Sequence, residues 1–159
     1  MYTKESFIKS LENEVRIIKH LATKIPEGTL DYRPTPVQRS TIELLKYLSA
    51  AGSGMMKAVL HNDTKVLADF EEFRNSVTLE NFGEKMDIQE KEMKEMFAQF
   101  KEEDYGKEVD FYGKALVSEH MINILRTFSA YRMQLFLYIK ANGVQLGTMN
   151  VWAGMDANQ

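Results

Sequence analysis

The stretch KALVSEHMINILRTFSAYRMQLFLYIKAN, residues 114–142, is the longest helical pattern in the chain and also the most apolar. Gly143 follows it, and glycine often ends a helix because it adopts left-handed backbone conformations at little cost. A line of uncharged polar side chains runs along this predicted helix, within about 40° of Thr127 when successive residues are separated by about 100°. The residues on the line are His120, Asn123, Thr127, Tyr131, Gln134 and Tyr138.

This polar line has two interpretations. It is either the solvent-facing side of a half-buried helix or the wall of a semi-buried pocket, where uncharged hydrogen-bonding groups are common. The predicted helix at residues 78–101 offers a contrast, because its polar face consists of glutamates and lysines that suit contact with water. The residues alone leave both interpretations open.

Apolar residues at spacings of three and four predict three more long helices. The predicted long helices are residues 3–25, a helix that starts at Ser40, residues 78–101 and residues 114–142. The second starts at a capping box formed by Ser40 and Glu43. A short helix is expected at residues 64–73, and the hydrophobic residues after Gly143 indicate a C-terminal tail packed on the bundle. The pattern predicts an all-α fold, a four-helix bundle formed by residues 1–159 as a single domain.

The middle of the second predicted helix, SAAGSG at residues 49–54, is unusually small. Two glycines inside a helix cost on the order of 1 kcal/mol each relative to alanine. Close approach of another helix would explain them. The alternatives are a dimer interface or clearance for a ligand.

Composition restricts the classes of function. The chain has 159 residues, a formal net charge of −3 and no cysteine. The acidic charge predicts no nucleic-acid partner, and the lack of cysteine excludes disulfides and thiolate metal sites. The sequence shows neither a signal peptide nor a stretch of roughly 20 apolar residues for a membrane span. We therefore expect a cytoplasmic protein with no membrane partner.

Two motifs carry a resemblance to a known family. The loop YRPTP at residues 32–36 is followed by STIELLKYL at residues 40–48, and the last long helix contains TFSAYRMQL at 127–135 and LYIKANG at 137–143. These segments resemble the DinB/YfiT-like family, whose usual patterns are a Y-R-P loop before S-x-x-E-L-L-x-H-L, and H-x-x-x-H-R-G-Q-L before Y-L-R-x-x-G. The resemblance implies an antiparallel four-helix bundle, commonly a homodimer. In members with the full motif, three histidines hold a divalent metal, and some members are thiol S-transferases that use bacillithiol or mycothiol, or metal-dependent hydrolases.

The three histidines of that pattern fall on Tyr47, Thr127 and Tyr131 in this chain. A phenol and a neutral hydroxyl are poor replacements for imidazole ligands, so we expect no metal cofactor. His120 lies two turns from Thr127, about 10 Å along the helix, too far to share a coordination shell with it. It is either a hydrogen-bonded interior histidine or a general base.

The leading hypothesis is a metal-free DinB-like protein with a small polar pocket between the second and fourth long helices. The expected lining residues are Tyr47, Asn123, Thr127, Tyr131 and Gln134, with His120 and Glu43 at the margin. The pocket would bind a small molecule or serve a structural role. One alternative is a transferase or hydrolase that uses Glu43, His120 and Tyr131 as acid–base groups. Another is an interaction module, and in each case a symmetric homodimer is expected.

Overall fold

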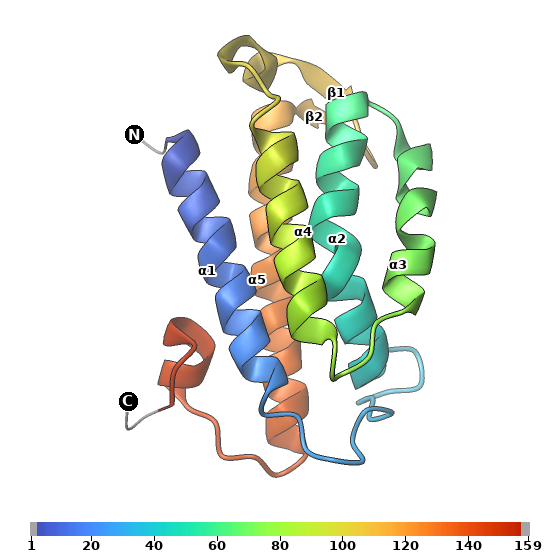
Figure 1. Cartoon of the computed structure of the whole chain (residues 1–159), viewed down its shortest axis with the longest axis vertical. Coiled ribbons are helices and arrows are strands. Elements are labelled where there is room, and N and C mark those ends of the chain that lie inside the picture. The colour runs from blue at the N-terminus through green and yellow to red at the C-terminus, as the bar shows by residue number, and fades with distance from the viewer. Residues whose placement is uncertain (1–2, 157–159) are drawn as a thin grey trace.

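Four long helices lie side by side along the molecule in the computed structural model, which describes residues 3–156 (Figure 1). They are α1 (Lys4–Ala22), α2 (Thr41–His61), α4 (Phe82–Phe97) and α5 (Val117–Ala141). The prediction of an all-α four-helix bundle is confirmed. α1 and α5 run in one direction and α2 and α4 in the other (Figure 1). The chain returns from the end of α2 to the start of α4 through the short helices η1 (Thr64–Phe70) and α3 (Glu71–Asn75), which pack against α2.

Side-chain caps start α1 and α2 where the sequence predicts them. The Thr3 hydroxyl accepts a hydrogen bond from the Ser6 amide at 3.1 Å. Ser40 and Glu43 form the predicted capping box, since the Ser40 amide donates to the Glu43 carboxylate at 2.7 Å and the Glu43 amide donates to the Ser40 hydroxyl at 3.4 Å. The box fixes the point at which the preceding loop meets α2.

The predicted start of the last helix at residue 114 is wrong. Lys114–Leu116 forms strand β2, which pairs antiparallel with β1 (Glu108–Asp110). Tyr112 and Gly113 have positive φ angles of 54° and 130° and reverse the chain between the strands. The amide of the last β2 residue then donates to the Glu119 carboxylate at 2.8 Å, so α5 begins at the next residue. Pairing with the neighbouring strand β1 therefore outweighs the helical preference of these residues. The spacing of apolar residues along one segment cannot reveal such pairing.

Two other helices are shorter than predicted. The first was expected at residues 3–25 and ends at Ala22, while the third was expected at 78–101 and spans Phe82–Phe97. Before α4, the Thr78 amide donates to the Asn81 side chain at 2.8 Å and the Asn81 amide donates to the Thr78 hydroxyl at 3.3 Å. This reciprocal pair makes a turn in place of the first helical turn.

The glycine-rich middle of α2 lies against two other helices. A Cβ atom on Gly52 would come within 2.7 Å of Phe128 Cζ on α5 and would also overlap the Met93 sulfur on α4. Both of those side chains are fully buried. Gly52 therefore allows close approach of α4 and α5, the first of the explanations that the sequence offered.

Gln89 of α4 joins this contact through its side-chain amide, which is fully buried. Its Oε1 accepts from the Gly52 amide at 2.8 Å, and its Nε2 donates to the Leu48 carbonyl at 2.8 Å. Those two backbone groups are the ones that an uninterrupted α-helix pairs with each other. The Gln89 amide thus bonds to the backbone of α2 at both of its polar atoms and ties α4 to α2.

The C-terminal segment packs along α1, which agrees with the predicted C-terminal tail on the bundle. It contains the short helix η3 (Met149–Ala153), and Val151 is buried. Arg16 of α1 donates to the Ala153 carbonyl at 2.8 Å, and Lys24 pairs with Asp156 at 2.7 Å. Contacts from its C-terminal part therefore hold the segment against α1 and the residues that follow that helix.

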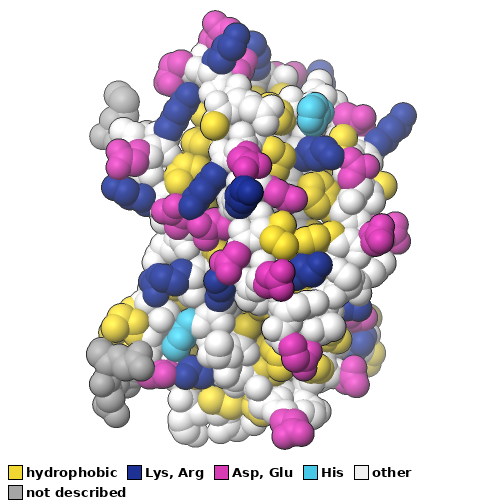
Figure 2. Space-filling view, in the orientation of Figure 1, with side chains coloured by type: hydrophobic (Ala, Val, Ile, Leu, Met, Phe, Trp, Pro, Cys, Tyr) yellow, Lys and Arg dark blue, Asp and Glu magenta, His cyan; other side chains and the backbone are white. Residues whose placement is uncertain are grey.

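Two further findings concern the apolarity of the helices and the charge of the surface. Among residues 3–156, none of the helices combines the length and apolarity needed to cross a bilayer. On the face drawn in Figure 2, acidic and basic side chains are interspersed along the described part of the chain. The expectation that nucleic acid is not a partner stays a prediction.

Candidate functional site

Two tyrosines and an arginine meet where α2 faces α5. The rings of Tyr47 and Tyr131 have centroids 4.7 Å apart, and both side chains are half-buried. The Arg39 guanidinium lies over the Tyr47 ring at 4.3 Å and is 5.7 Å from the Tyr131 ring. A guanidinium over aromatic faces is attracted by the negative charge of the π-system. The three residues form a cationic, aromatic cluster.

A buried tyrosine positions Arg39. The Tyr138 hydroxyl donates to the Arg39 carbonyl at 2.9 Å and in turn accepts a hydrogen bond from the Gln134 amide. The Tyr32 ring packs edge-on against the Tyr138 ring, with centroids 5.6 Å apart. α5 therefore anchors the loop that carries Arg39.

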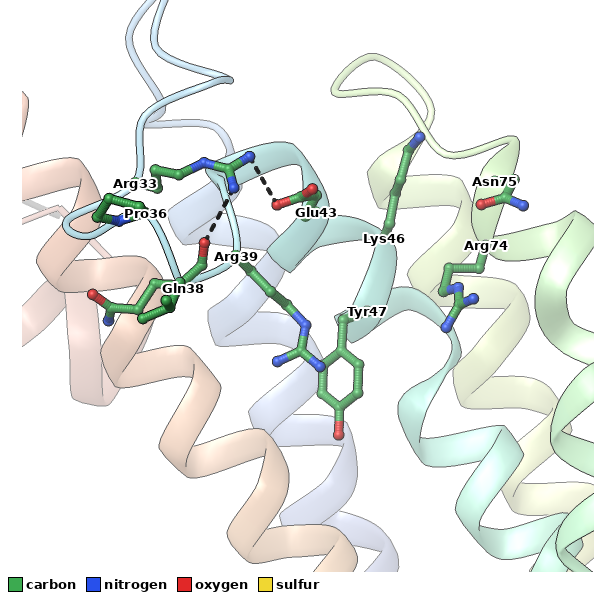
Figure 3. A pocket seen from close by; sticks show the side chains of 10 residues that line it. Arg33, Pro36, Gln38, Arg39, Glu43, Lys46, Tyr47, Arg74 and Asn75 are labelled. Atoms are coloured by element: carbon green, nitrogen blue, oxygen red, sulfur yellow. Dashed lines mark hydrogen bonds and ion pairs between the residues drawn. The ribbon is translucent and has the colours of Figure 1, made fainter.

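A cavity of about 540 Å³ lies beside Tyr47, between this loop, α2 and α3. Figure 3 shows Arg39 on one side of the Tyr47 ring and Arg74, which comes from α3, on the other. We call it the cationic cavity, because its charged lining consists of four cations and one carboxylate. They are Arg33, Arg39, Lys46 and Arg74, with Glu43 as the acid.

Little of this positive charge is neutralised. Glu43 pairs with Arg33 at 3.2 Å, the ion pair drawn in Figure 3. The hydrogen bond from the Ser40 amide, followed by the charge of Arg33, holds the pKa of Glu43 below its usual range. Neither Lys46 nor Arg74 has an ion-pair partner among residues 3–156. The cavity therefore has an excess of cations in a chain whose formal net charge is −3.

A second cavity, of about 300 Å³, adjoins the first and shares Tyr47 and Arg74 with it. We call it the apolar cavity, because the rest of its lining consists of small, aliphatic and aromatic residues. They are Ala50, Ala51, Gly54 and Met55 of α2, Leu67 and Phe70 of η1, and Phe111 and Tyr112 of the β1–β2 turn.

The structure separates most of the residues that the sequence grouped together. Tyr47 borders both cavities and Glu43 borders the cationic one, but Asn123, Thr127, Tyr131, Gln134 and His120 border neither. These two cavities lie on the side of α2 that faces η1 and α3, and the expected pocket between the second and fourth long helices stays a prediction. The rings of Tyr47 and Tyr131 pack against each other where α2 meets α5.

His120 has a structural contact far from this cluster. Its side chain is buried, its Nε2 lies 3.0 Å from the Val109 carbonyl, and its ring packs against Phe111. Eleven residues separate it from Tyr131, about 16 Å along a helix. The structure does not bring Glu43, His120 and Tyr131 together as acid–base groups.

Two other residues of the polar line bond within α5. The Thr127 hydroxyl donates to the Asn123 carbonyl at 2.9 Å, and the exposed Asn123 side chain accepts from Arg126 at 3.2 Å. Thr127 is half-buried, and its hydroxyl lies 3.9 Å from the sulfur of Met55, which lines the apolar cavity. Along the polar line, His120 and Tyr138 are therefore buried and Asn123 is exposed, while the other three residues are half-buried.

Comparisons with known proteins bear on the fold. No family model matches the chain, and no curated protein is significantly similar to it in sequence. A crystal structure described as a DinB-like protein, YjoA from Bacillus subtilis, is similar to this structure with a TM-score of 0.73 over 88% of this chain and 94% of that chain. The chain has a DinB-like fold. Because the two sequences are only 16% identical, the likeness establishes the fold alone.

The DinB-like pattern implies a divalent metal on the positions of Tyr47, Thr127 and Tyr131, and these side chains suit one poorly. Burial, followed by the neighbouring Tyr131, raises the pKa of Tyr47, so its hydroxyl keeps its proton at neutral pH. The adjacent Arg39 guanidinium would repel a second cation. Residues 3–156 contain no group of three or more histidine, aspartate or glutamate side chains arranged to hold a metal ion.

The sequence interpretation missed Arg39 and Arg74. Arg39 immediately precedes the capping box, so its place beside α2 could have been inferred from the start of that helix. Arg74 belongs to a short helix and borders the same cavities as Tyr47 only because η1 and α3 fold back on α2. No local pattern in the sequence indicates that arrangement.

Proposed function

We propose that this chain is a metal-free DinB-like protein that binds a small anionic molecule in the cationic cavity. The observation that carries the proposal is the set of four cations around one cavity of about 540 Å³, with Glu43 as the one carboxylate in its lining. Ligand cavities commonly have volumes of about 300–1,000 Å³ and a few convergent polar groups. Arginine also suits carboxylate and phosphate groups, because its planar N–H donors match their paired oxygens.

Arg39 is the central residue of this proposal. It lies next to Tyr47, a position that the DinB-like pattern assigns to a metal ligand, and it supplies a fixed positive charge there. Its stacking on Tyr47 and the hydrogen bond from Tyr138 to its carbonyl organise it before a ligand arrives. Such preorganisation reduces the entropy lost on binding. The Arg39 charge replaces the attraction for an anion that a metal would provide.

Elemental analysis of untagged protein tests the metal-free part of the proposal. We expect transition metals well below one atom per chain, and no change in thermal stability after dialysis against a chelator. A stoichiometric metal that chelation removes with loss of stability would contradict the proposal.

Titration with acetate and with inorganic phosphate, followed by NMR shifts of the Arg39 and Arg74 side chains, tests anion binding. Arg39→Gln and Arg74→Gln should each weaken binding roughly tenfold, because each loses a charge-assisted hydrogen bond. Arg126→Gln is the matched control, since Arg126 is exposed on α5 and borders neither cavity. Equal affinities in all three variants would contradict the proposal.

A further inference from the structure

The two cavities differ in chemistry and meet at a shared boundary. Tyr47 and Arg74 border both of them. On one side of this boundary lie the other three cations, and on the other lie Ala50, Gly54 and Leu67 with their neighbours. A single molecule that crossed the boundary would meet charge at one end and hydrocarbon at the other.

Small residues of α2 create the apolar cavity. Ala50, Ala51 and Gly54 occupy the helix face that η1 covers, and a Cβ atom on Gly54 would lie 3.2 Å from Leu67 of η1. The aromatic rings of Phe70 and Phe111 border the same space from η1 and from the β1–β2 turn. Three separate segments therefore enclose this space.

We propose that the anion bound in the cationic cavity carries an apolar chain or ring that occupies the apolar cavity. This inference rests on the proposed function and adds the class of ligand, an amphipathic carboxylate or phosphate monoester. A cavity of about 150 Å³ holds benzene, so one of about 300 Å³ accommodates roughly ten carbon atoms. Arg74 lies at the boundary without an ion-pair partner among residues 3–156, where it is available to the anionic head group.

A series of linear carboxylates from acetate to dodecanoate, measured by calorimetry on the full chain, tests the proposal. Each buried CH₂ group should increase the affinity by up to about fourfold until the apolar cavity is full, after which the affinity should level off. The corresponding alkyl phosphates should show the same dependence on chain length, and decanol should bind far more weakly than decanoate.

Two variants that change the size of the apolar cavity sharpen the test. Ala51→Leu fills the apolar cavity and should abolish the gain in affinity with chain length. Leu67→Ala enlarges it and should move the plateau to longer chains, which keeps the test decisive if the first variant does not fold. Ala98→Leu is the matched control, because Ala98 is exposed and borders neither cavity.

The outcomes separate this inference from the proposed function. Acetate binding that depends on Arg39 but does not strengthen with chain length would overturn the inference and leave the proposed function intact. Failure of every carboxylate and phosphate to bind would overturn both. Decanol binding as tightly as decanoate would overturn the inference, because the anionic head group would then add nothing to the affinity. Retention on vesicles of anionic phospholipid without binding of monomeric decanoate would overturn the inference in favour of a membrane surface.

Discussion

At the scale of single residues, Gly52 allows the close contact among α2, α4 and α5. We expect Gly52→Ala to lower the free energy of unfolding by about 1–3 kcal/mol, because its methyl group would overlap the buried Phe128 ring and the Met93 sulfur. Urea unfolding measures the change. Gly83→Ala in α4 is the control: its Cβ would meet only Lys19 Cε at 3.8 Å, so it should be neutral or stabilise by up to about 1 kcal/mol. An equal effect of both substitutions would refute the role of close packing at Gly52.

A buried ion pair between two single residues also affects the stability of the protein. Arg132 of α5 pairs with Glu14 of α1 at 3.2 Å, and Ser129 donates to the same carboxylate oxygen at 2.8 Å. Among the described residues, Glu14 Oε2 and Arg132 Nε have no hydrogen-bond partner. Burial raises the pKa of Glu14 above 4.5, while Ser129 and Arg132 act in the opposite direction. Since the folded pKa is raised, the contribution of Glu14 to stability is full below pH 4.5 and is lost as the pH rises through the folded pKa.

We therefore expect Arg132→Met to destabilise the protein by roughly 3 kcal/mol at pH 7.5, because it leaves a buried carboxylate without its cation. The loss should be smaller at pH 5, since the pKa of Glu14 rises further without Arg132 and its carboxyl group takes up a proton. Urea unfolding at both pH values tests this. The double variant Glu14→Leu/Arg132→Met is the control and should recover most of the stability. A loss that does not depend on pH would show that Glu14 is not the titrating group.

At the scale of elements, the C-terminal segment depends on its contact with α1. Gly154 has a φ of +56°, and a Cβ there would lie 2.9 Å from the Arg16 guanidinium and 3.2 Å from the Ile17 Cα. Gly154→Ala should release the segment, which changes the fluorescence of Trp152, the one tryptophan in the chain. Gly143→Ala is the control, because Gly143 has a φ of +90° with nothing within 4 Å, so it isolates the cost of backbone strain. Identical spectra for the two variants would rule out the clash.

At the scale of the whole molecule, the expected homodimer needs an interface. Gly52 and Gly54 are not available, because side chains of the same chain occupy the space beside them. Exposed apolar side chains remain on α5, where Ile122, Met133 and Leu137 are 45%, 37% and 55% exposed. Light scattering should give twice the chain mass of 18.4 kDa, and Leu137→Glu should halve it. Met149→Glu, on η3, should have no effect. A wild-type mass near 18.4 kDa at micromolar concentration would contradict the dimer.

The sequence by itself determined that the chain forms four long helices and that a capping box at Ser40 and Glu43 starts the second. These features follow from the identity of each residue and from spacings of three or four, which act within one or two helical turns. That Tyr47, Thr127 and Tyr131 hold no metal stays a prediction from the identity of these residues. Even the contact between Tyr47 and Tyr131 followed from a resemblance in local motifs.

Only the tertiary structure decided where the cavities lie and which charges surround them. Arg74 borders the same cavities as Tyr47 because η1 and α3 fold back over α2, and Gln89 bonds to the backbone of α2 because α4 packs on that helix. β2 replaces the first turn predicted for α5 because a second strand lies beside it. Each of these contacts joins residues that are distant in sequence or belong to different elements. The energies of these contacts depend on how the whole chain packs. The local spacing of apolar residues carries no information about that packing.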